Sequence, residues 1–251
     1  MTQWRERSVV ELAVPQASGV ACLGDGLFLV VDDDRGVYLA GEKGGADLIS
    51  SREDHRELRD LEGICLSPDG AAWVLSERTS AVYSLSVARE GRDVEVGPPT
   101  LVAEIEHIAR KKNKGWEGIA LWRGPTTRVV ACHEAKPKRV GVFAVDTLET
   151  LAMLELPDSI KDALGDISDL TVDPETGRLL LLSDESAAIA EAEFVLDDDS
   201  APTGLVLVEL TELRLGKKEK AEGLCFDEAQ VLWMVTDGDP HLRAFGRGPG
   251  E

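Results

Sequence analysis

The sequence predicts an all-β protein, a five-bladed β-propeller of four-stranded antiparallel blades. Three observations lead to this class. A short motif returns five times at intervals of about 44 to 55 residues, a spacing that suits a four-stranded blade. Each copy opens an apolar run, and most are followed by a turn of Pro, Asp or Gly and a second apolar run, as in hairpins. A surplus strand near the N-terminus matches a missing strand in the last repeat.

The motif copies mark the innermost strands of the predicted blades. They are Ser18-Gly19-Val20, Glu62-Gly63-Ile64, Glu117-Gly118-Ile119, Asp169-Leu170-Thr171 and Glu222-Gly223-Leu224. The expected blades cover about 17–50, 61–104, 116–156, 167–210 and 221–246, within a single domain spanning 1–251. Because the last unit lacks a fourth strand, we expect the run 8–14 to complete it, closing the ring and removing an exposed sheet edge.

Two segments interrupt the strand pattern. Pro157 to Leu164 carries Ile160 and Leu164 at helical spacing, which predicts a short helix before the fourth blade. The segment from Leu101 to Lys114 contains a candidate helical turn before the third blade. Both precede an innermost strand, so both should border the same mouth of the channel.

The composition excludes some partners. The chain has 47 Asp and Glu against 27 Lys and Arg, a formal net charge of −20. Such a field repels nucleic acid and anionic membranes and attracts cations and basic proteins. We find no signal-peptide pattern and no membrane-spanning run, and we expect a cytoplasmic protein, with an envelope location open if a leader was removed. The four cysteines form no C-x-x-C pair and are expected to be buried thiols.

Acidic residues recur at two fixed places in the repeats. Counting from the hairpin turns, the first residue of each motif falls opposite a residue that follows the second apolar run. The predicted pairs are Ser18 with Asp33, Glu62 with Glu77, Glu117 with Glu134, Asp169 with Asp184, and Glu222 with Asp237. Nine of these ten positions are acidic, so we expect the nine carboxylates to converge at one mouth of the channel.

Like charges that face each other destabilise a sheet and raise one another's pKa. Other groups must therefore offset the repulsion between these carboxylates. A site of oxygen donors suits a hard cation, and calcium is favoured over magnesium by the number of ligands; no organic cofactor is expected. The alternative is that the carboxylates accept backbone N–H groups from the next blade and tie the ring together. The glycine beside each acid fits that alternative, because it lets backbones crowd near the axis.

Other side chains are weaker candidates. The acids that would act in catalysis are Glu77 and Glu134, and His133 is a candidate general base; a half-buried structural histidine is the alternative. Arg78 and Lys136 would contact an anionic ligand group, unless they are solvated loop charges. Trp116 would stack on a ligand, or pack between blades.

Several of these segments resemble the SdiA-regulated family. They are Leu61-Glu62-Gly63-Ile64 with Ala72–Glu77, His133-Glu134-Ala135-Lys136-Pro137, Ile167–Leu170 with Asp173–Gly177 and Leu182–Ser186, and Ala221–Asp227, within about 58–245. The resemblance implies a five-bladed propeller whose acidic mouth is the site and binds calcium. Ser18 departs from the acidic pattern, so the ring is incomplete, and the leader and anchor common in the family do not occur in this sequence.

The Glu-Gly and Ser-Glu pattern is also similar to that of phytase-like esterase propellers. Three functions follow. We favour a binding propeller whose calcium-binding mouth recognises a small molecule or peptide. The alternatives are a metal-dependent phosphoester hydrolase and a protein-interaction scaffold for a basic partner. Whether the protein is an enzyme stays open, because propellers host all three functions.

Overall fold

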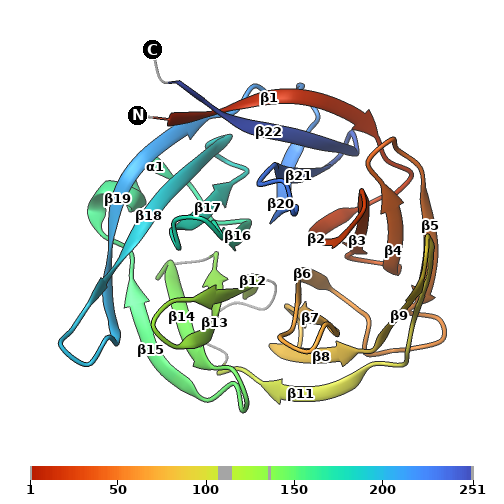
Figure 1. Cartoon of the computed structure of the whole chain (residues 1–251), viewed down its shortest axis with the longest axis horizontal. Helices are drawn as coiled ribbons and strands as arrows, with labels where there is room; N and C mark the ends of the chain where they lie inside the picture. Colours follow the sequence, from red (N-terminus) through yellow and green to blue (C-terminus); the bar gives the residue numbers. More distant parts are fainter. Residues whose placement is uncertain (1, 107–114, 135–136, 250–251) are drawn as a thin grey trace.

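Five strands stand around a central axis in the computed structural model, one from each repeat of the sequence (Figure 1). They are β2 (Ala17–Gly24), β6 (Leu61–Leu66), β12 (Trp116–Arg123), β16 (Asp169–Val172) and β20 (Lys220–Phe226). The structure describes residues 2–106, 115–134 and 137–249. Each innermost strand belongs to its own four-stranded antiparallel sheet, so the predicted five-bladed propeller is confirmed.

The outer strands follow the innermost ones in chain order in four of the blades. Blade 1 continues with β3 (Leu27–Asp32), β4 (Gly36–Gly41) and β5 (Ala46–Ser51). Blade 2 adds β7 (Ala72–Ser76), β8 (Ala81–Leu85) and β11 (Thr100–Glu104). Blade 3 adds β13 (Thr127–His133), β14 (Arg139–Ala144) and β15 (Thr150–Glu155). Blade 4 adds β17 (Leu179–Ser183), β18 (Ala188–Leu196) and β19 (Pro202–Glu212).

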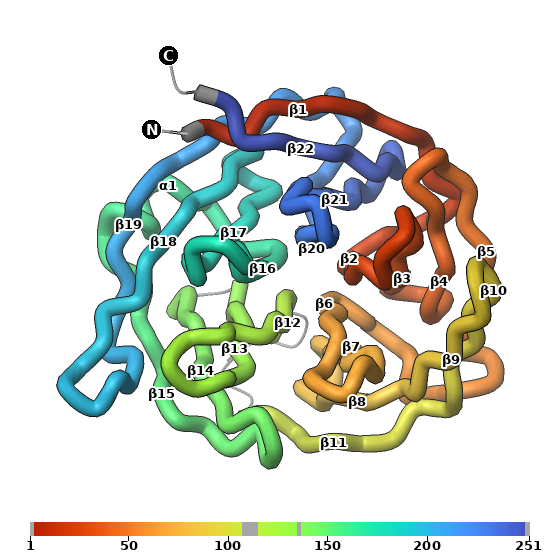
Figure 2. The backbone as a smooth tube through the Cα atoms, viewed as in Figure 1, coloured from red at the N-terminus to blue at the C-terminus, as the bar shows by residue number. Residues whose placement is uncertain are grey.

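Blade 5 joins the two ends of the chain. It contains β21 (Leu232–Asp237) and β22 (His241–Pro249), and its outermost strand is β1 (Thr2–Glu11), which pairs antiparallel with β22 (Figure 2). The N-terminal strand therefore closes the ring as predicted, but it spans 2–11 rather than 8–14. A bulge between Glu6 and Ser8 shifts its register and lets the longer strand follow β22.

Three further elements differ from the predictions or complete them. The helix α1 (Asp158–Ala163) confirms the one expected between 157 and 164. The other candidate turn falls largely on 107–114, outside the described residues. A hairpin of β9 (Val87–Glu90) and β10 (Asp93–Val96) was not predicted, because its exposed, charged residues show no apolar run. The strand β18 supplies the third strand of blade 4, although Glu191 interrupts its apolar pattern.

Burial on both faces explains the apolar runs of the second strands. Every residue of β3, β7 and β17 is buried, because each blade packs against a neighbour on either side. Cys65, Cys132 and Cys225 are buried free thiols, as expected, whereas Cys22 is partly exposed. Among the described residues, no helix is long and apolar enough to cross a membrane.

An ion-pair network fastens the closing strand. The guanidinium of Arg243 on β22 contacts both carboxylate oxygens of Glu219 and also pairs with Glu6 on β1. The Glu219 side chain is only 2% exposed and lies 2.8 Å from Nδ1 of His241. Burial acts to raise the pKa of Glu219, but hydrogen bonds from Arg243 and the Gly216 N–H outweigh it, and the pKa falls below its ordinary value.

We expect Arg243→Ala to lower the free energy of unfolding by about 3–5 kcal/mol, because it strands the buried Glu219 carboxylate without its partner. Urea unfolding followed by circular dichroism measures this loss. The matched control is Arg52→Ala, which removes a 2.5 Å pair with Asp34 whose side chains are 37% and 55% exposed. The control should cost about 0–1 kcal/mol. Equal costs for the two variants would contradict the assignment.

Candidate functional site

A bulge stands at the same place in four of the five innermost strands. The ladder to the second strand shifts register between Ala17 and Gly19, Leu61 and Gly63, Trp116 and Gly118, and Ala221 and Gly223. The extra residues at these shifts are Ser18, Glu62, Glu117 and Glu222, the motif positions that the sequence singled out. Bulges re-aim side chains and are frequent near functional sites.

The predicted pairing of acids across each hairpin is wrong. In blades 2, 3 and 5 the ladder next to the turn already lies one residue from the counted register; Gly63, for example, pairs with Leu75 rather than Ser76. The bulges then take Ser18, Glu62, Glu117 and Glu222 out of the ladder, so they do not meet the predicted partners Asp33, Glu77, Glu134 and Asp237. In blade 4 no bulge occurs, and Asp169 pairs with Leu182 instead of Asp184. Counting from the turns thus gave the wrong hairpin register and could not detect the inserted residues.

The acids of the second series nevertheless lie at the same end of the blades as the first. Asp33, Glu77, Glu134 and Asp184 directly follow β3, β7, β13 and β17, and Asp237 is the last residue of β21. Carboxylates of different blades also interact through their charges. Asp33 of blade 1 and Glu222 of blade 5 both act on Glu62, and Glu62 in turn acts on Glu117. The carboxylates of different blades thus gather around one mouth.

Burial and repulsion between carboxylates raise the pKa values of the inner glutamates. Burial is the main cause that raises the pKa of Glu62 and Glu117 well above the ordinary value, and the neighbouring carboxylates add to it. The same two causes raise the pKa of Glu222 to about 8, although the positive charge of Lys220 opposes them. In the described part of the chain no hydrogen bond reaches these three partly exposed carboxylates.

The pKa values of the acids that follow the second strands are raised for the same reasons. Burial first, and then the charge of Asp60, raises the pKa of Asp33. Burial and then Glu134 raise that of Glu77, and burial and then Asp166 raise that of Asp184. Sequence reasoning missed Asp60 and Asp166, since both precede the repeated motif and belong to neither acidic series.

Asp169 has a different role from the three glutamates. Its carboxylate is buried and accepts the backbone N–H of Leu224 in blade 5 at 2.6 Å. Burial raises its pKa well above the ordinary value even though this hydrogen bond opposes the shift. The hydroxyl of Ser18 likewise donates to the carbonyl of Leu61 in blade 2. The interpretation of the repeated residue as a tie between blades therefore holds for Asp169 and Ser18.

The remaining candidates lie in varied places. His133 is completely buried and meets the ring of Trp116 edge-on at 5.4 Å, which favours packing over general-base chemistry. Trp116 is itself fully buried, so its ring offers no face to a ligand. Arg78 is 67% exposed and pairs with Asp60 at 3.6 Å. Lys136 lies outside the described residues.

The carboxylates at the mouth offer oxygen donors, which hard cations prefer. Among the described residues, no thiol or imidazole belongs to this group of acids. The spacing is open. Within the described ranges, no three His, Cys, Asp or Glu side chains are grouped so as to hold a metal ion. The chemistry of the donors fits calcium, whereas a closed cage is not preformed.

A model of the SdiA-regulated family matches residues 24–242. The chain belongs to this family. The match includes four of the five motif positions, Glu62, Glu117, Asp169 and Glu222, whereas Ser18 precedes it.

Solved propellers share the architecture at low identity. A glutaminyl cyclase of Myxococcus xanthus superposes with a TM-score of 0.58 and 11% identity over 100% of this chain and 98% of that one. A PQQ-bound aldose sugar dehydrogenase of Streptomyces coelicolor gives 0.58 and 12% over 99% of both chains. Virginiamycin B lyase of Staphylococcus aureus gives 0.53 and 9% over 97% and 99%. At these identities the similarity supports the fold alone and indicates no reaction for this chain.

We expect Asp169→Ala to lower the free energy of unfolding by about 1–3 kcal/mol, because the buried N–H of Leu224 loses its acceptor. Chemical denaturation measures the loss. Glu117→Gln is the comparison, since no hydrogen bond is lost there, and it should be neutral or stabilising. A destabilisation by Glu117→Gln as large as that of Asp169→Ala would assign both residues to the same tying role.

Without divalent cations, the melting temperature should fall as the pH rises from 5 to 9. Folded Glu222 keeps its proton up to a pKa of about 8, whereas the unfolded chain releases it near 4.5. Its contribution to stability is therefore complete below 4.5 and is lost as the pH passes about 8. Glu222→Gln should flatten the decline in calorimetric scans, and Glu95→Gln on the exposed part of β10 should not. An unchanged slope in Glu222→Gln would refute this account.

Proposed function

We propose that the protein is a binding propeller whose acidic mouth holds a hard divalent cation, with calcium as the first candidate, and recognises a small molecule or peptide there. One observation carries the proposal: among the described residues no hydrogen bond reaches the carboxylates of Glu62, Glu117 and Glu222, and the charges of other carboxylates at the mouth contribute to raising their pKa values. A divalent cation relieves that repulsion, whereas no protein group described here does so fully.

The open spacing of the acids is compatible with calcium in particular. Calcium accepts six to eight oxygen ligands in flexible geometry and retains waters, whereas magnesium demands a near-ideal octahedron. Carboxylates that stand apart around a channel can share such an ion with water. The expected affinity is modest, because the ring must give up protons and draw inward. A bound cation would also compete with the positive charge of Lys220 for the carboxylate of Glu222.

Calorimetric titration of chelator-treated protein with calcium tests the proposal. We expect a dissociation constant of roughly 0.1–1 mM. At the tight end of that range, 10 mM calcium would add about 2.7 kcal/mol of stability, seen as a rise in melting temperature. Glu117→Gln and Glu77→Gln should lose the binding, while Glu95→Gln keeps it. No heat and no stabilisation in the wild-type protein would overturn the metal assignment.

The affinity for calcium should increase with pH. Cations and protons compete for carboxylates whose pKa is raised, so binding at pH 6 must displace protons that are largely absent at pH 9. Titrations in two buffers of different ionisation heat would count the released protons. An affinity independent of pH would place the ion away from Glu62, Glu117 and Glu222.

The same preparation separates the alternatives. Turnover of phosphate monoesters and diesters by the calcium-loaded protein, lost in Glu77→Gln, would favour the metal-dependent hydrolase. Binding of a Lys-rich or Arg-rich peptide that is equally tight with chelator present would favour a scaffold for a basic partner. We rank binding first because the described mouth supplies charge and oxygen donors, while His133 is completely buried.

A further inference from the structure

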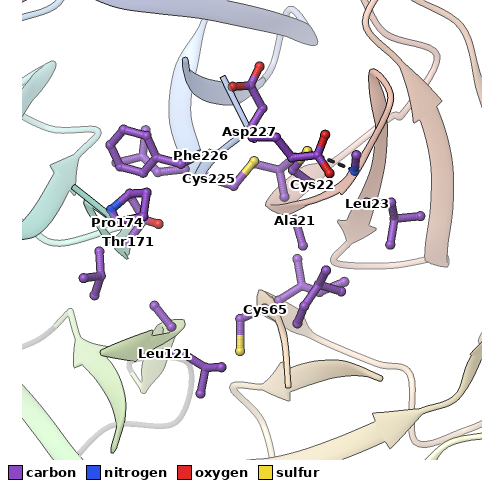
Figure 3. Close-up of a pocket in the computed structure, with 18 of the residues that line it drawn as sticks. Ala21, Cys22, Leu23, Cys65, Leu121, Thr171, Pro174, Cys225, Phe226 and Asp227 are labelled. Carbon is purple, nitrogen blue, oxygen red and sulfur yellow. Dashed lines mark hydrogen bonds between the residues drawn. The ribbon is translucent and has the colours of Figure 1, made fainter. Parts of the chain in front are cut away.

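A pocket of about 410 Å³ opens at the other end of the channel, where the innermost strands end (Figure 3). Residues from all five innermost strands or the turns after them line it, including Cys22, Cys65, Leu121, Thr171 and Phe226. Along each strand the acid or serine comes first, the close-packed position second, and the pocket residues last. The pocket is therefore distinct from the acidic mouth, and no residue of the acidic ring lines it.

Small side chains create this space. The third residue after the repeated acid or serine is Ala21, Cys65, Ala120, Val172 or Cys225, and all five line the pocket. Isoleucine or leucine at these places would fill the axis. The residues just before them, including Ile64 and Ile119, add an apolar wall.

The thiols in the pocket contribute to its apolar character. Burial raises the pKa of Cys65 to about 12, and burial also raises the pKa of Cys22 and of Cys225 above the ordinary value. They stay protonated at neutral pH and act as small hydrophobic groups rather than as nucleophiles or metal ligands. The side chains that line the pocket are mostly apolar, with charged groups at the rim, and its volume of a few hundred Å³ is in the range of small-molecule sites.

Charges at the rim indicate the polarity of the ligand. Glu228 is exposed in the turn after β20, and its Oε1 would lie only 2.6 Å from a Cβ atom on Gly24, so this carboxylate stands against the β2–β3 turn. Asp227, the preceding residue (labelled in Figure 3), also lines the pocket, but both of its oxygens are engaged by Trp233 Nε1 and the backbone N–H groups of Ala229 and Val231. Glu228 is thus available to a ligand. Arg123 brings an opposing charge at the far side of the rim.

We propose that this pocket is a second binding site, for a small apolar molecule that carries an amino group. The apolar body would occupy the space left by the small residues, and the ammonium group would lie near Glu228. The net charge of −20 favours a cationic ligand over an anionic one at either end of the channel.

Titration calorimetry with three indoles of similar size tests the site. The probes are tryptamine, neutral 3-methylindole and anionic indole-3-acetate, in calcium-free buffer. We expect saturable binding, with the affinity decreasing from tryptamine to 3-methylindole to indole-3-acetate. Ala120→Phe should weaken tryptamine binding by about tenfold or more, which corresponds to 1.4 kcal/mol or more, because the new ring fills the pocket. Ala88→Phe, on exposed β9, should leave binding unchanged.

Charge variants keep the test decisive if Ala120→Phe does not fold, since both replaced side chains are exposed. Glu228→Gln should weaken tryptamine binding, and Arg123→Gln should strengthen it, each by roughly two- to fivefold. Glu62→Gln at the other mouth should leave it unchanged. Absence of saturable binding, indifference to Ala120→Phe, tightest binding of the anionic probe, or loss of binding in Glu62→Gln would each overturn the proposal.

Discussion

A Cβ atom on Gly63 would lie 2.8 Å from the carbonyl oxygen of Glu117, and one on Gly223 would lie 2.8 Å from the Cα of Gly19. Neighbouring innermost strands therefore approach so closely that only glycine fits at these points. This contact sets the diameter of the channel and the register of the strands around it. Because equivalent residues of neighbouring blades are brought to one level, a residue type that repeats in the sequence becomes a ring in space.

The same contact divides the channel into two chemically different ends. One step before the glycines, Glu62, Glu117 and Glu222 form part of a group of carboxylates that repel one another. Two steps after them, the ring consists of small apolar residues that leave a cavity. The propeller geometry thus turns one short motif into an acidic mouth and an apolar pocket. Each end inherits its chemistry from a different position of the repeat.

Repulsion at the mouth is tolerated because other contacts hold the blades. Asp169 and Ser18 take the repeated position but bind the backbone of the next blade instead of leaving a charge free. At the seam between the chain ends, Arg243 ties β22 to β1 and to the loop before β20. Trp4 of β1 adds a further link, with its indole N–H donating to the buried carboxylate of Glu191 in blade 4 at 2.8 Å. These fixed contacts leave Glu62, Glu117 and Glu222 available for a ligand.

The sequence by itself determined the number of blades, the closing strand, the short helix and the set of acids at one mouth, because each depends on a local pattern that repeats. Only the tertiary structure decided how those acids are arranged. The bulges at Glu62, Glu117 and Glu222 add a residue that periodicity cannot reveal. Asp60 and Asp166 lie at the mouth although they stand outside the repeated motif, and the pocket at the other end is lined by small residues that look ordinary in any one strand. Local pattern specifies an element, whereas a site formed from five blades depends on which side chains the ring brings together across long separations in the chain.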